Sequence, residues 1–384
     1  MSEPIGIGVV GAGMIAQRGI LPHLSQEDVQ DRLRLVAVCD PAPGRAAASA
    51  ERFGIATPYD AFEELLADPA VDAVSIASPI GLHFEQAKAA LEAGKHVHVN
   101  KTMSTTTAEA DELIALAADR SLSLVASPGE VLRPQLIAIR GLIAQGAIGQ
   151  LCWGICGCSL GNYHEADEEA ERTSVPGGVP ADPSWYFRQP GGGPMYDVTV
   201  YALHQLTSVL GPARRVTAMS GTVVPSRKFL GTEIVTEVDD NTIQLLDFGD
   251  GVQVVVYGTA AGNVIEDFAA GQYFGTEGSI VGLQLNGAPI EFEGRELTTD
   301  RPTWDWDAQM RVLPHVVGAH REIPESHVFE DIMQLVGLVR DGTPTPVTPE
   351  HSRHVIEIIE AGYRAAETGQ TQDLRTTFEF VVGP

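Results

Sequence analysis

The chain has 384 residues, with 25 Lys and Arg against 51 Asp and Glu, which gives a formal net charge of −26. Because this length exceeds what one hydrophobic core usually supports, we expect two domains. An acidic excess of this size repels phosphate backbones and anionic lipids, so it excludes nucleic acid and membrane surfaces as partners.

The sequence also indicates a cellular compartment. No basic segment precedes the first apolar run, as a signal peptide would require, and no stretch approaches the roughly 20 apolar residues that cross a bilayer. The four cysteines are too few for a disulfide scaffold, and we interpret them as small buried residues and not as metal ligands. We therefore expect a cytoplasmic protein without a metal site.

Residues 1–127 alternate strand-like and helix-like segments. Apolar runs predict strands at residues 5–10, 33–39, 73–77, 96–99 and 122–126. Helical patterns lie between them and beside them, at residues 13–24, 42–53, 61–66, 81–93 and 108–119. Strands joined by helices of this length need crossover connections, so we predict an α/β domain of the Rossmann type, with a doubly wound parallel sheet.

The pattern of predicted strands and helices changes in residues 128–384. Long strand-like segments, such as 241–248 and 252–259, are joined by turns rich in Asp and Gly, and helical patterns recur at 201–210 and 326–369. These features predict an α+β domain with a large, mostly antiparallel open sheet. We expect its final helices to pack back on the first domain.

A glycine-rich turn follows the first strand and opens the first helix. Its residues are Gly11, Ala12, Gly13, Met14, Ile15 and Ala16, a G-x-G-x-x-A pattern in the strand–turn–helix context of dinucleotide sites. Gly11 permits the tight turn, Gly13 lets the backbone approach a pyrophosphate, and the start of the helix offers free N–H groups. We predict that Gly11, Gly13, Met14 and Ile15 bind the cofactor.

The second predicted strand ends at Asp40. A carboxylate there accepts hydrogen bonds from ribose hydroxyls and repels a 2′-phosphate, so the sequence favours NAD over NADP. Arg45 lies close enough along the chain to reach a 2′-phosphate, which keeps NADP open as the second choice. The alternative interpretation of Asp40 is an Asp-Pro turn that merely ends the strand.

Two further loops leave the carboxyl ends of predicted strands, where ligands of parallel sheets bind. The first holds Ser78, Pro79 and His83, and the second holds Asn100 and Lys101. All five are predicted to contact the cofactor. Lys101 is one of four lysines in the chain, and its ammonium would polarise a substrate oxygen during hydride transfer. A lysine that only extends from a strand end is the other interpretation.

Two segments resemble a known family. Residues 77–102, ASPIGLHFEQAKAALEAGKHVHVNKT, are similar to the A-T-P-x-x-x-H…A-G-K-H-V-x-x-E-K-P signature, and residues 191–201, GGGPMYDVTVY, to the G-G-G-x-x-x-D-x-G-x-H/Y motif. Both belong to the Gfo/Idh/MocA oxidoreductases, named after glucose–fructose oxidoreductase, inositol dehydrogenase and a rhizopine-catabolism protein. The resemblance implies hydride transfer from a hydroxyl carbon of a sugar, glycoside or cyclitol to NAD. It also implies a homodimer or homotetramer through the C-terminal sheet.

The resemblance carries a catalytic set onto this sequence. Lys101, Asp197 and Tyr201 match the motif positions, and His204 follows three residues later. The spacing i, i+4, i+7 would place Asp197, Tyr201 and His204 on one helical face, where they can relay a proton. Whether Tyr201 or His204 is the base stays open, as does the direction of the reaction.

Departures from the family pattern leave other functions open. Asn100 and Thr102 replace the Glu and Pro of E-K-P, and Thr199 replaces a Gly. An NADP-linked carbonyl reductase and a catalytically silent, cofactor-bound sensor are therefore the alternatives to a dehydrogenase.

Aromatic and charged side chains outside the motifs supply further candidates. Trp185 and Arg188, just before the glycine-rich motif, are expected to contact the substrate together with Lys101, Asp197 and His204; the alternative for the aromatic segment is a hydrophobic anchor. Residues 162–172 are expected to form an acidic loop near the substrate, and residues 304–306 a sugar-facing loop or an interface. The remaining C-terminal histidines, His315, His320, His327, His351 and His354, show no ligand spacing and are expected to be structural or exposed.

Overall fold

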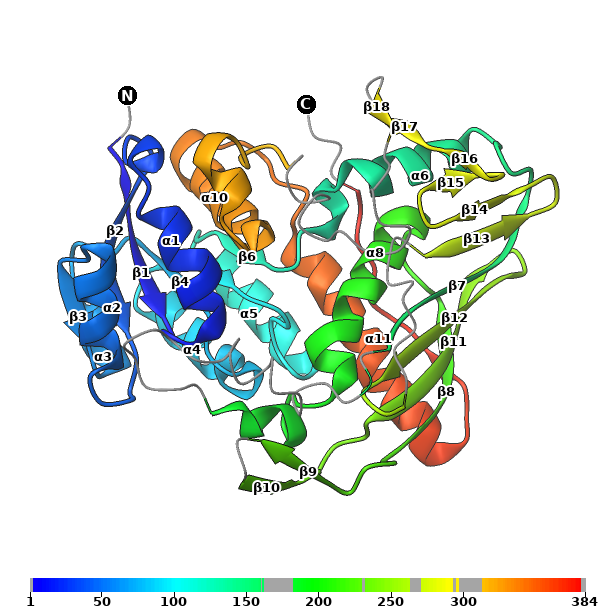
Figure 1. Ribbon diagram of the computed structural model, residues 1–384, viewed down its shortest axis with the longest axis horizontal. Helices are drawn as coiled ribbons and strands as arrows, with labels where there is room; N and C mark the ends of the chain where they lie inside the picture. The colour runs from blue at the N-terminus through cyan, green and yellow to red at the C-terminus, as the bar shows by residue number, and fades with distance from the viewer. Residues whose placement is uncertain are drawn as a thin grey trace.

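A computed structural model describes residues 3–159, 161, 182–229, 232–262, 271–292, 295–296 and 313–380. Two large sheets stand apart in Figure 1, one among the blue and cyan elements and one among the green and yellow ones, with helices between them. No helix in these residues is long and apolar enough to cross a membrane. The expected loops at 162–172 and 304–306 lie outside the described residues.

The first sheet is parallel throughout, which confirms the predicted Rossmann-type fold. Its order is β3-β2-β1-β4-β5-β6, so the chain moves outward in both directions from β1 and β4. The carboxyl ends of these strands form a crevice at that reversal of strand order. The strands are β1 (Ile5–Val10), β2 (Leu33–Cys39), β3 (Thr57–Tyr59), β4 (Ala73–Ile76), β5 (His96–Val99) and β6 (Leu124–Ala126).

Capping residues and glycines mark the ends of helices that connect these strands. Thr106 and Glu109 form a reciprocal capping box at the start of α5, and Gly44 and Gly54, both left-handed, flank α2. The helix after β1 contains a π-helical turn, η1, before α1. The helices are η1 (Ala16–Ile20), α1 (Leu21–Leu24), α2 (Arg45–Phe53), α3 (Phe62–Ala67), α4 (His83–Glu92) and α5 (Thr107–Asp119).

The second sheet is mixed and mostly antiparallel, with β7 and β12 as its parallel pair. In the described residues its order is β16-β15-β14-β13-β7-β12-β11-β8-β19. The longer strands are β7 (Leu151–Ser159), β8 (Arg215–Gly221), β11 (Asn241–Gly249), β12 (Val252–Thr259), β13 (Gln272–Gly275) and β14 (Ser279–Val281). The short ones are β15 (Gln284–Leu285), β16 (Ala288–Pro289) and β19 (Gln372–Asp373), beside the separate pairs β9 (Ser226–Phe229) with β10 (Thr232–Val235) and β17 (Glu291–Phe292) with β18 (Arg295–Glu296).

One face of this second sheet packs on helices and the other is open. Buried side chains of α6 (Pro134–Ala144), α8 (Val200–Leu210) and α11 (Pro349–Thr368) form a core with inward-facing residues such as Val216 and Val254. On the opposite face Trp153, Met219 and Ile243 are exposed. Antiparallel sheets tolerate such one-sided packing, although exposed apolar area of this kind is common at interfaces.

Of the last two long helices, the first packs mainly on the first half of the chain and the second packs on both halves (Figure 1). Helix α10 (Ser326–Asp341) buries Phe329 and Ile332 in the core around β1, η1 and α1. Helix α11 places Ile356 against the core around β4 and β5, while Ile358 and Ile359 enter the core of the second sheet. Residues far apart in sequence therefore hold the two sheets in a fixed relation.

Phe329 tests this packing. It is 1% exposed and its ring stacks on His23 and His320, at centroid distances of 4.7 and 4.2 Å. We expect Phe329→Ala to lower the free energy of unfolding by about 3–5 kcal/mol, because it leaves a cavity in the first core. Urea unfolding without cofactor measures it, with the half-exposed Val317→Ala as control, expected to change stability by under about 0.5 kcal/mol. An equal effect of both variants would contradict this packing.

Candidate active site

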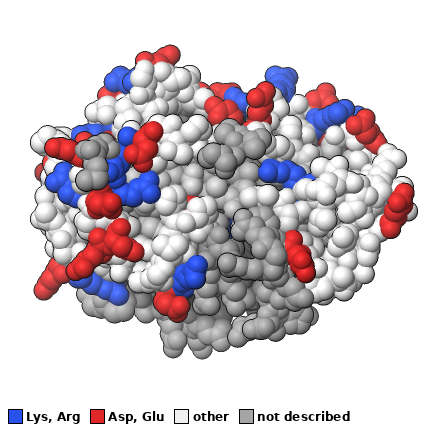
Figure 2. All heavy atoms as spheres, turned by 90° about the horizontal axis from the view of Figure 1, so that it is seen from above, with Lys and Arg blue, Asp and Glu red and all other residues white. Residues whose placement is uncertain are grey.

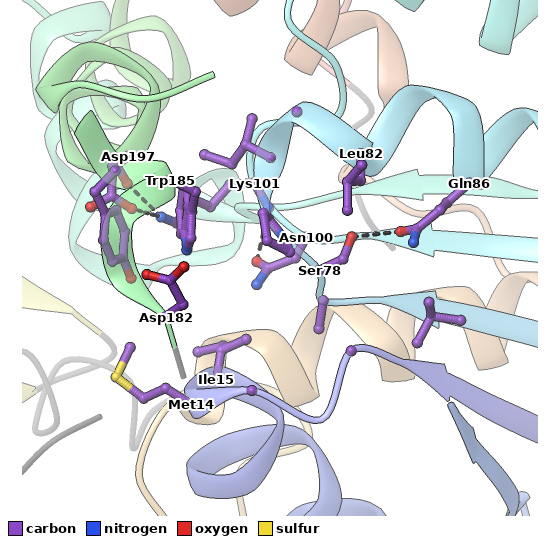
Figure 3. Close-up of a pocket in the computed structure, with 18 of the residues that line it drawn as sticks. Met14, Ile15, Ser78, Leu82, Gln86, Asn100, Lys101, Asp182, Trp185 and Asp197 are labelled. Atoms are coloured by element: carbon purple, nitrogen blue, oxygen red, sulfur yellow. Dashed lines mark hydrogen bonds and ion pairs between the residues drawn. The ribbon is translucent and has the colours of Figure 1, made fainter. Parts of the chain in front are cut away.

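A cleft of about 1010 Å³ lies between the first sheet and the following part of the chain. The loops after β1, β2, β4 and β5 form one wall, at the carboxyl edge of the parallel sheet. Residues 182–190, the start of α8 with the preceding π-helical turn η6 (Met195–Thr199), and two residues beside the start of α10 form the facing wall. Figure 3 shows Ser78, Asn100 and Lys101 on the sheet side and Asp197 and Trp185 opposite them.

The turn after β1 is shaped for close approach of a phosphate. Gly11 has a φ of +88°, and a Cβ there would lie 2.8 Å from the backbone of Ala77, so the position requires glycine. A Cβ on Gly13 would meet nothing within 4 Å, so this backbone faces open space. Met14 and Ile15 line the cleft beside the two glycines. These residues fit the pyrophosphate of a dinucleotide, whose charge the start of the helix would stabilise.

Asp40 is buried at the end of β2. Its two carboxylate oxygens accept hydrogen bonds from the backbone N–H groups of Ala12 and Ala42, at 2.8 and 2.9 Å. The Arg45 guanidinium lies 3.2 and 3.3 Å from the same oxygens, and both side chains line the cleft. The carboxylate therefore fixes the glycine turn and also holds a cation at this end of the cleft.

The loops after β4 and β5 place three predicted cofactor residues in the cleft: Ser78, Pro79 and Asn100. Ser78 Oγ donates a hydrogen bond to Gln86 Oε1 at 2.5 Å, and Asn100 Oδ1 accepts one from the Lys101 N–H at 2.8 Å (Figure 3). Each loop is thus held by its own side chains.

His83 does not line the cleft, unlike the expectation that it contacts the cofactor. It is 1% exposed, and its ring nitrogens lie 2.6 Å from the Thr102 carbonyl oxygen and 2.8 Å from that of Ser78. Burial lowers the pKa of His83. The ring joins the two loops from behind, because α4 starts at His83 and points its first turn under both of them.

Lys101 lies where the two walls meet. Its Nζ donates hydrogen bonds to Asp197 Oδ1 at 2.6 Å and to the Asp197 carbonyl oxygen at 2.5 Å, and it lies 5.4 Å from the centre of the Tyr201 ring. The two charged side chains are only 14% and 6% exposed. Among the described residues the ammonium makes no further hydrogen bond, so its third N–H is available to an incoming oxygen.

Tyr201 keeps its proton at neutral pH. Its side chain lines the cleft, and its pKa is raised well above 10, mainly by burial and then by the charges of Glu325 and Asp197. Lys101, Asp197 and Tyr201 therefore come together as their motifs imply, with a neutral phenol beside a buried ion pair.

His204 is not brought to this group, which differs from the predicted helical face. It is 2% exposed and does not line the cleft, and its ring lies 4.6 Å from that of His351. Burial lowers its pKa to about 3. The prediction counted 3.6 residues per turn from Asp197, but Met195–Thr199 form a π-helical turn, which holds more residues and rotates later side chains away.

His327 and Glu325 line the cleft instead, and sequence reasoning missed both as functional residues. The hydroxyl of Tyr201 lies 3.1 Å from His327 Nε2, and His327 Nδ1 lies 3.8 Å from Glu325 Oε2. No local pattern marks this pair, because it meets Tyr201 only through the packing of α10. His327 was expected to be structural or exposed; the structure buries it, with 5% of its surface exposed, and places it in the lining of the cleft.

The expected substrate residues Trp185 and Arg188 belong to the wall opposite the sheet. Trp185 lies in the short helix η5 (Pro183–Phe187), and its ring centre is 3.8 Å from that of Tyr186. Arg188 is exposed at the end of this helix. Aromatic surface beside a cation and the carboxylate of Asp182 suits a polar ring-shaped ligand.

Acidic and basic side chains are mixed and do not form one large region of a single sign. Figure 2 shows acidic and basic side chains interspersed on the face it draws, over a chain whose net charge is −26. The cleft itself is lined by four basic residues, Arg18, Arg45, Lys101 and Arg188, and by four acidic ones, Asp40, Asp182, Asp197 and Glu325. An anionic cofactor would therefore meet nearby cations and backbone N–H groups, although the protein as a whole is acidic.

Comparison with known families agrees with this geometry. Residues 5–127 match the oxidoreductase family with an NAD-binding Rossmann fold, Gfo/Idh/MocA, and residues 136–281 match a C-terminal domain of the same family. The chain is a Gfo/Idh/MocA oxidoreductase. As a member it has an NAD-binding Rossmann domain and is an NAD(P)-dependent enzyme.

Individual members of the Gfo/Idh/MocA family resemble the whole chain. D-glucoside 3-dehydrogenase of Escherichia coli is 25% identical, with 97% of this chain and 98% of the relative covered. NADP⁺-dependent scyllo-inositol 2-dehydrogenase of Bacillus subtilis is also 25% identical, with 96% of each covered. A levoglucosan dehydrogenase solved with NADH and levoglucosan shares the fold, with a TM-score of 0.72 at 20% identity, covering 97% of this chain and all of the other.

Asp40 provides a test of cofactor choice. Asp40→Ser removes the charge that repels a 2′-phosphate and frees Arg45 to bind one, so we expect the NADP-to-NAD ratio of kcat/KM to rise about tenfold or more. Reduced-nicotinamide absorbance measures both rates. Asp31→Ser, at an exposed position before β2, is the control and leaves the ratio unchanged. An unchanged NAD preference in Asp40→Ser would show that another residue selects the cofactor.

Proposed function

We propose that the enzyme transfers hydride from a secondary hydroxyl carbon of a sugar, glycoside or cyclitol to NAD. The observation that carries this proposal is the buried Lys101–Asp197 pair, which lies beside Tyr201 in the same cleft as the dinucleotide turn. We further propose that residues 1–127 bind the cofactor and residues 128–384 bind the substrate. A cytoplasmic location stays a prediction from the sequence.

The substrate class rests on the chemistry of the cleft and on the relatives. Trp185 and Tyr186 offer ring faces to the C–H face of a sugar, while Asp182 and Arg188 offer hydrogen bonds to its hydroxyls. The names of the relatives give a glucoside and an inositol as substrates, and both are rings that carry several hydroxyl groups. These observations favour a polyhydroxylated ring as the substrate.

The proposed roles follow from the contacts. The dinucleotide, when bound, accepts the hydride, and the residues of the glycine turn, Asp40 and Asn100 would hold it. Lys101 uses its third N–H to bind the substrate oxygen and stabilises negative charge as the hydroxyl loses its proton. Asp197 holds the ammonium in position through a hydrogen bond of 2.6 Å. Tyr201 takes up the hydroxyl proton, and His204 has no role because it does not line the cleft.

A second candidate is an NADP-linked carbonyl reductase. Arg45 favours it, because its guanidinium lines the cleft within 3.3 Å of the Asp40 carboxylate. The same residues would then act in the reverse direction, with Lys101 bound to a carbonyl oxygen. Against it stands the carboxylate itself, which repels a 2′-phosphate.

Turnover tests the proposed function. We expect reduction of NAD with at least one member of a panel of sugars, glycosides and cyclitols, followed by absorbance of the reduced nicotinamide. In Lys101→Met the rate should fall about 10²-fold or more, since the charge that stabilises the developing alkoxide is lost, while NADH affinity changes little. Cofactor binding without turnover on any panel member would favour the silent sensor.

We also propose a homodimer or homotetramer that pairs the open faces of the second sheet. Met219, Ile243, Leu245 and Trp153 are all at least 38% exposed, and the strand register places them on one face. Burying this apolar area between two copies would stabilise the assembly.

A charge on that face tests the assembly. We expect Ile243→Glu to shift the protein toward monomer, because the carboxylate would lose its water at the interface. Light scattering after size exclusion measures the mass. Val235→Glu, on the separate β9–β10 pair and 66% exposed, serves as the control and leaves the mass unchanged. An unaltered oligomer in Ile243→Glu would rule out this face.

A further inference from the structure

Three side chains from two distant segments of the chain lie next to one another along the cleft. Tyr201 comes from α8, His327 from the start of α10, and Glu325 from the residues before it. The Tyr201 hydroxyl lies 3.1 Å from His327 Nε2, and the two rings meet edge to face at 71°. His327 Nδ1 in turn lies 3.8 Å from Glu325 Oε2. All three side chains line the cleft.

Glu325 is held in an unusual backbone conformation at the end of this row. Its φ is +59°, in the left-handed region that non-glycine residues rarely occupy. Gly19, in the first helix, packs closely against it, since a Cβ at Gly19 would lie only 2.7 Å from Glu325 Cβ. The carboxylate remains 20% exposed, against 6% for the His327 side chain. Of the two groups beyond Tyr201, Glu325 is therefore the one that reaches water.

The protonation states at rest leave Tyr201 unable to act alone. Its phenol is neutral, because burial and nearby carboxylates raise its pKa well above 10. A neutral phenol can take the proton of a substrate hydroxyl only if it passes its own proton onward. The atom placed to receive that proton is His327 Nε2.

His327 is neutral at rest, so Nε2 can accept the Tyr201 proton, and the same surroundings make the resulting imidazolium short-lived, so the proton has to pass onward. Burial and four positively ionising groups that face it lower its pKa well below 6.5: Arg133, Lys101, His23 and His98. Glu325 is the acidic group facing it, through Nδ1, and Tyr201 faces it through Nε2. The Tyr201 hydroxyl, at hydrogen-bond distance, donates to an Nε2 that carries no hydrogen, which places the ring hydrogen on Nδ1. Glu325 Oε2 lies 3.8 Å from Nδ1, which is an ion-pair distance and longer than a hydrogen bond.

We propose that His327 and Glu325 complete a proton relay that carries the substrate's hydroxyl proton from Tyr201 to solvent. This inference rests on the proposed dehydrogenase function. As the C–H bond breaks and its electron pair leaves as hydride, the O–H bond breaks and its proton passes to Tyr201 Oη. The phenol gives its own proton to His327 Nε2 across 3.1 Å. The imidazolium then gives the Nδ1 proton to Glu325, once the 3.8 Å between them closes to hydrogen-bond distance, and the carboxyl group returns that proton to water. The carbonyl product and one released proton balance the step.

Other groups near the reacting position do not offer this route. The Asp197 carboxylate accepts a hydrogen bond from the Lys101 ammonium, so a proton placed on it would weaken the ion pair. His204 does not line the cleft. Among the described histidines, His327 is the one in the lining of this cleft. The relay is therefore built from residues that the family motifs do not include.

His327→Gln separates proton transfer from positioning. The glutamine amide can still hydrogen-bond the Tyr201 hydroxyl, but it cannot accept and release a proton. We expect kcat for alcohol oxidation at pH 7 to fall about 10- to 100-fold, with KM and the NADH affinity measured by fluorescence within about twofold of wild type. Added imidazole should restore part of the rate. An unchanged kcat would overturn the relay and leave His327 as a positioning residue.

Glu325→Gln tests the outer end of the relay. We expect a smaller loss, about three- to tenfold in kcat at pH 7, because water reaches this end and can replace the carboxylate in part. The loss should lessen as pH rises, since hydroxide can then accept the proton from the imidazolium. Glu322→Gln, an exposed position in the same segment, is the matched control and keeps the wild-type pH profile. Equal behaviour of the two variants would exclude Glu325.

A readout independent of turnover comes from ring ¹⁵N NMR of the wild-type protein. We expect a neutral His327 ring with hydrogen on Nδ1 at pH 7. A charged ring at pH 7 would overturn the relay, because an imidazolium cannot take up a proton. If wild type oxidises a panel substrate but His327→Gln keeps its rate, the relay alone fails. If wild type oxidises none, the proposed function fails first and the relay with it.

Discussion

The ion pair between Lys101 and Asp197 links the two parts of the molecule at the point where chemistry is proposed. Lys101 follows the fifth strand of the parallel sheet, and Asp197 lies in the π-helical turn that opens α8. Two hydrogen bonds, at 2.6 and 2.5 Å, join the ammonium to the side chain and backbone of Asp197. Because both groups are largely buried, removing one would leave the other charge without compensation. The pair therefore holds the cation that we propose to be catalytic and joins the two walls of the cleft.

Two features surround this pair: helices that pack into the cores of the sheets, and backbone N–H groups that carry partial positive charge. Helices α10 and α11 each enter a core of the first sheet, and α11 enters that of the second as well, so the cleft is bounded by elements that cannot move independently. The glycine turn and the start of the first helix offer N–H groups to a pyrophosphate. A chain with a net charge of −26 thus offers an anionic cofactor local N–H groups and not a basic surface.

Much of the fold could be predicted from local pattern. Alternating apolar runs and helical segments specify a parallel sheet, and the position of the glycines after β1 specifies the turn. Lys101, Asp197 and Tyr201 were identified through two motifs. These motifs lie far apart in the sequence, but their residues meet in the fold. The short edge strand β3 was missed, since three residues carry too little periodicity to be recognised.

The rest of the site depends on information that no local pattern holds. His204 was misplaced because a single π-helical turn changes the rotation of every later residue in the helix. His327 was overlooked because it reaches Tyr201, 126 positions earlier, only after α10 has packed on the first sheet. His83 belongs to a motif, yet its buried ring contacts the carbonyl oxygens of two loops and does not line the cleft. The sequence does not tell which side of a loop a side chain supports.

The central claim is that a substrate hydroxyl binds between Lys101 and Tyr201, beside the bound cofactor. A crystal structure with NADH and a turned-over substrate measures this most directly. We expect the reacting oxygen within hydrogen-bond distance of both Lys101 Nζ and the Tyr201 hydroxyl, with the substrate ring against Trp185. A substrate bound away from Lys101, for example in the separate cavity of about 550 Å³ beside Tyr363, would contradict the account.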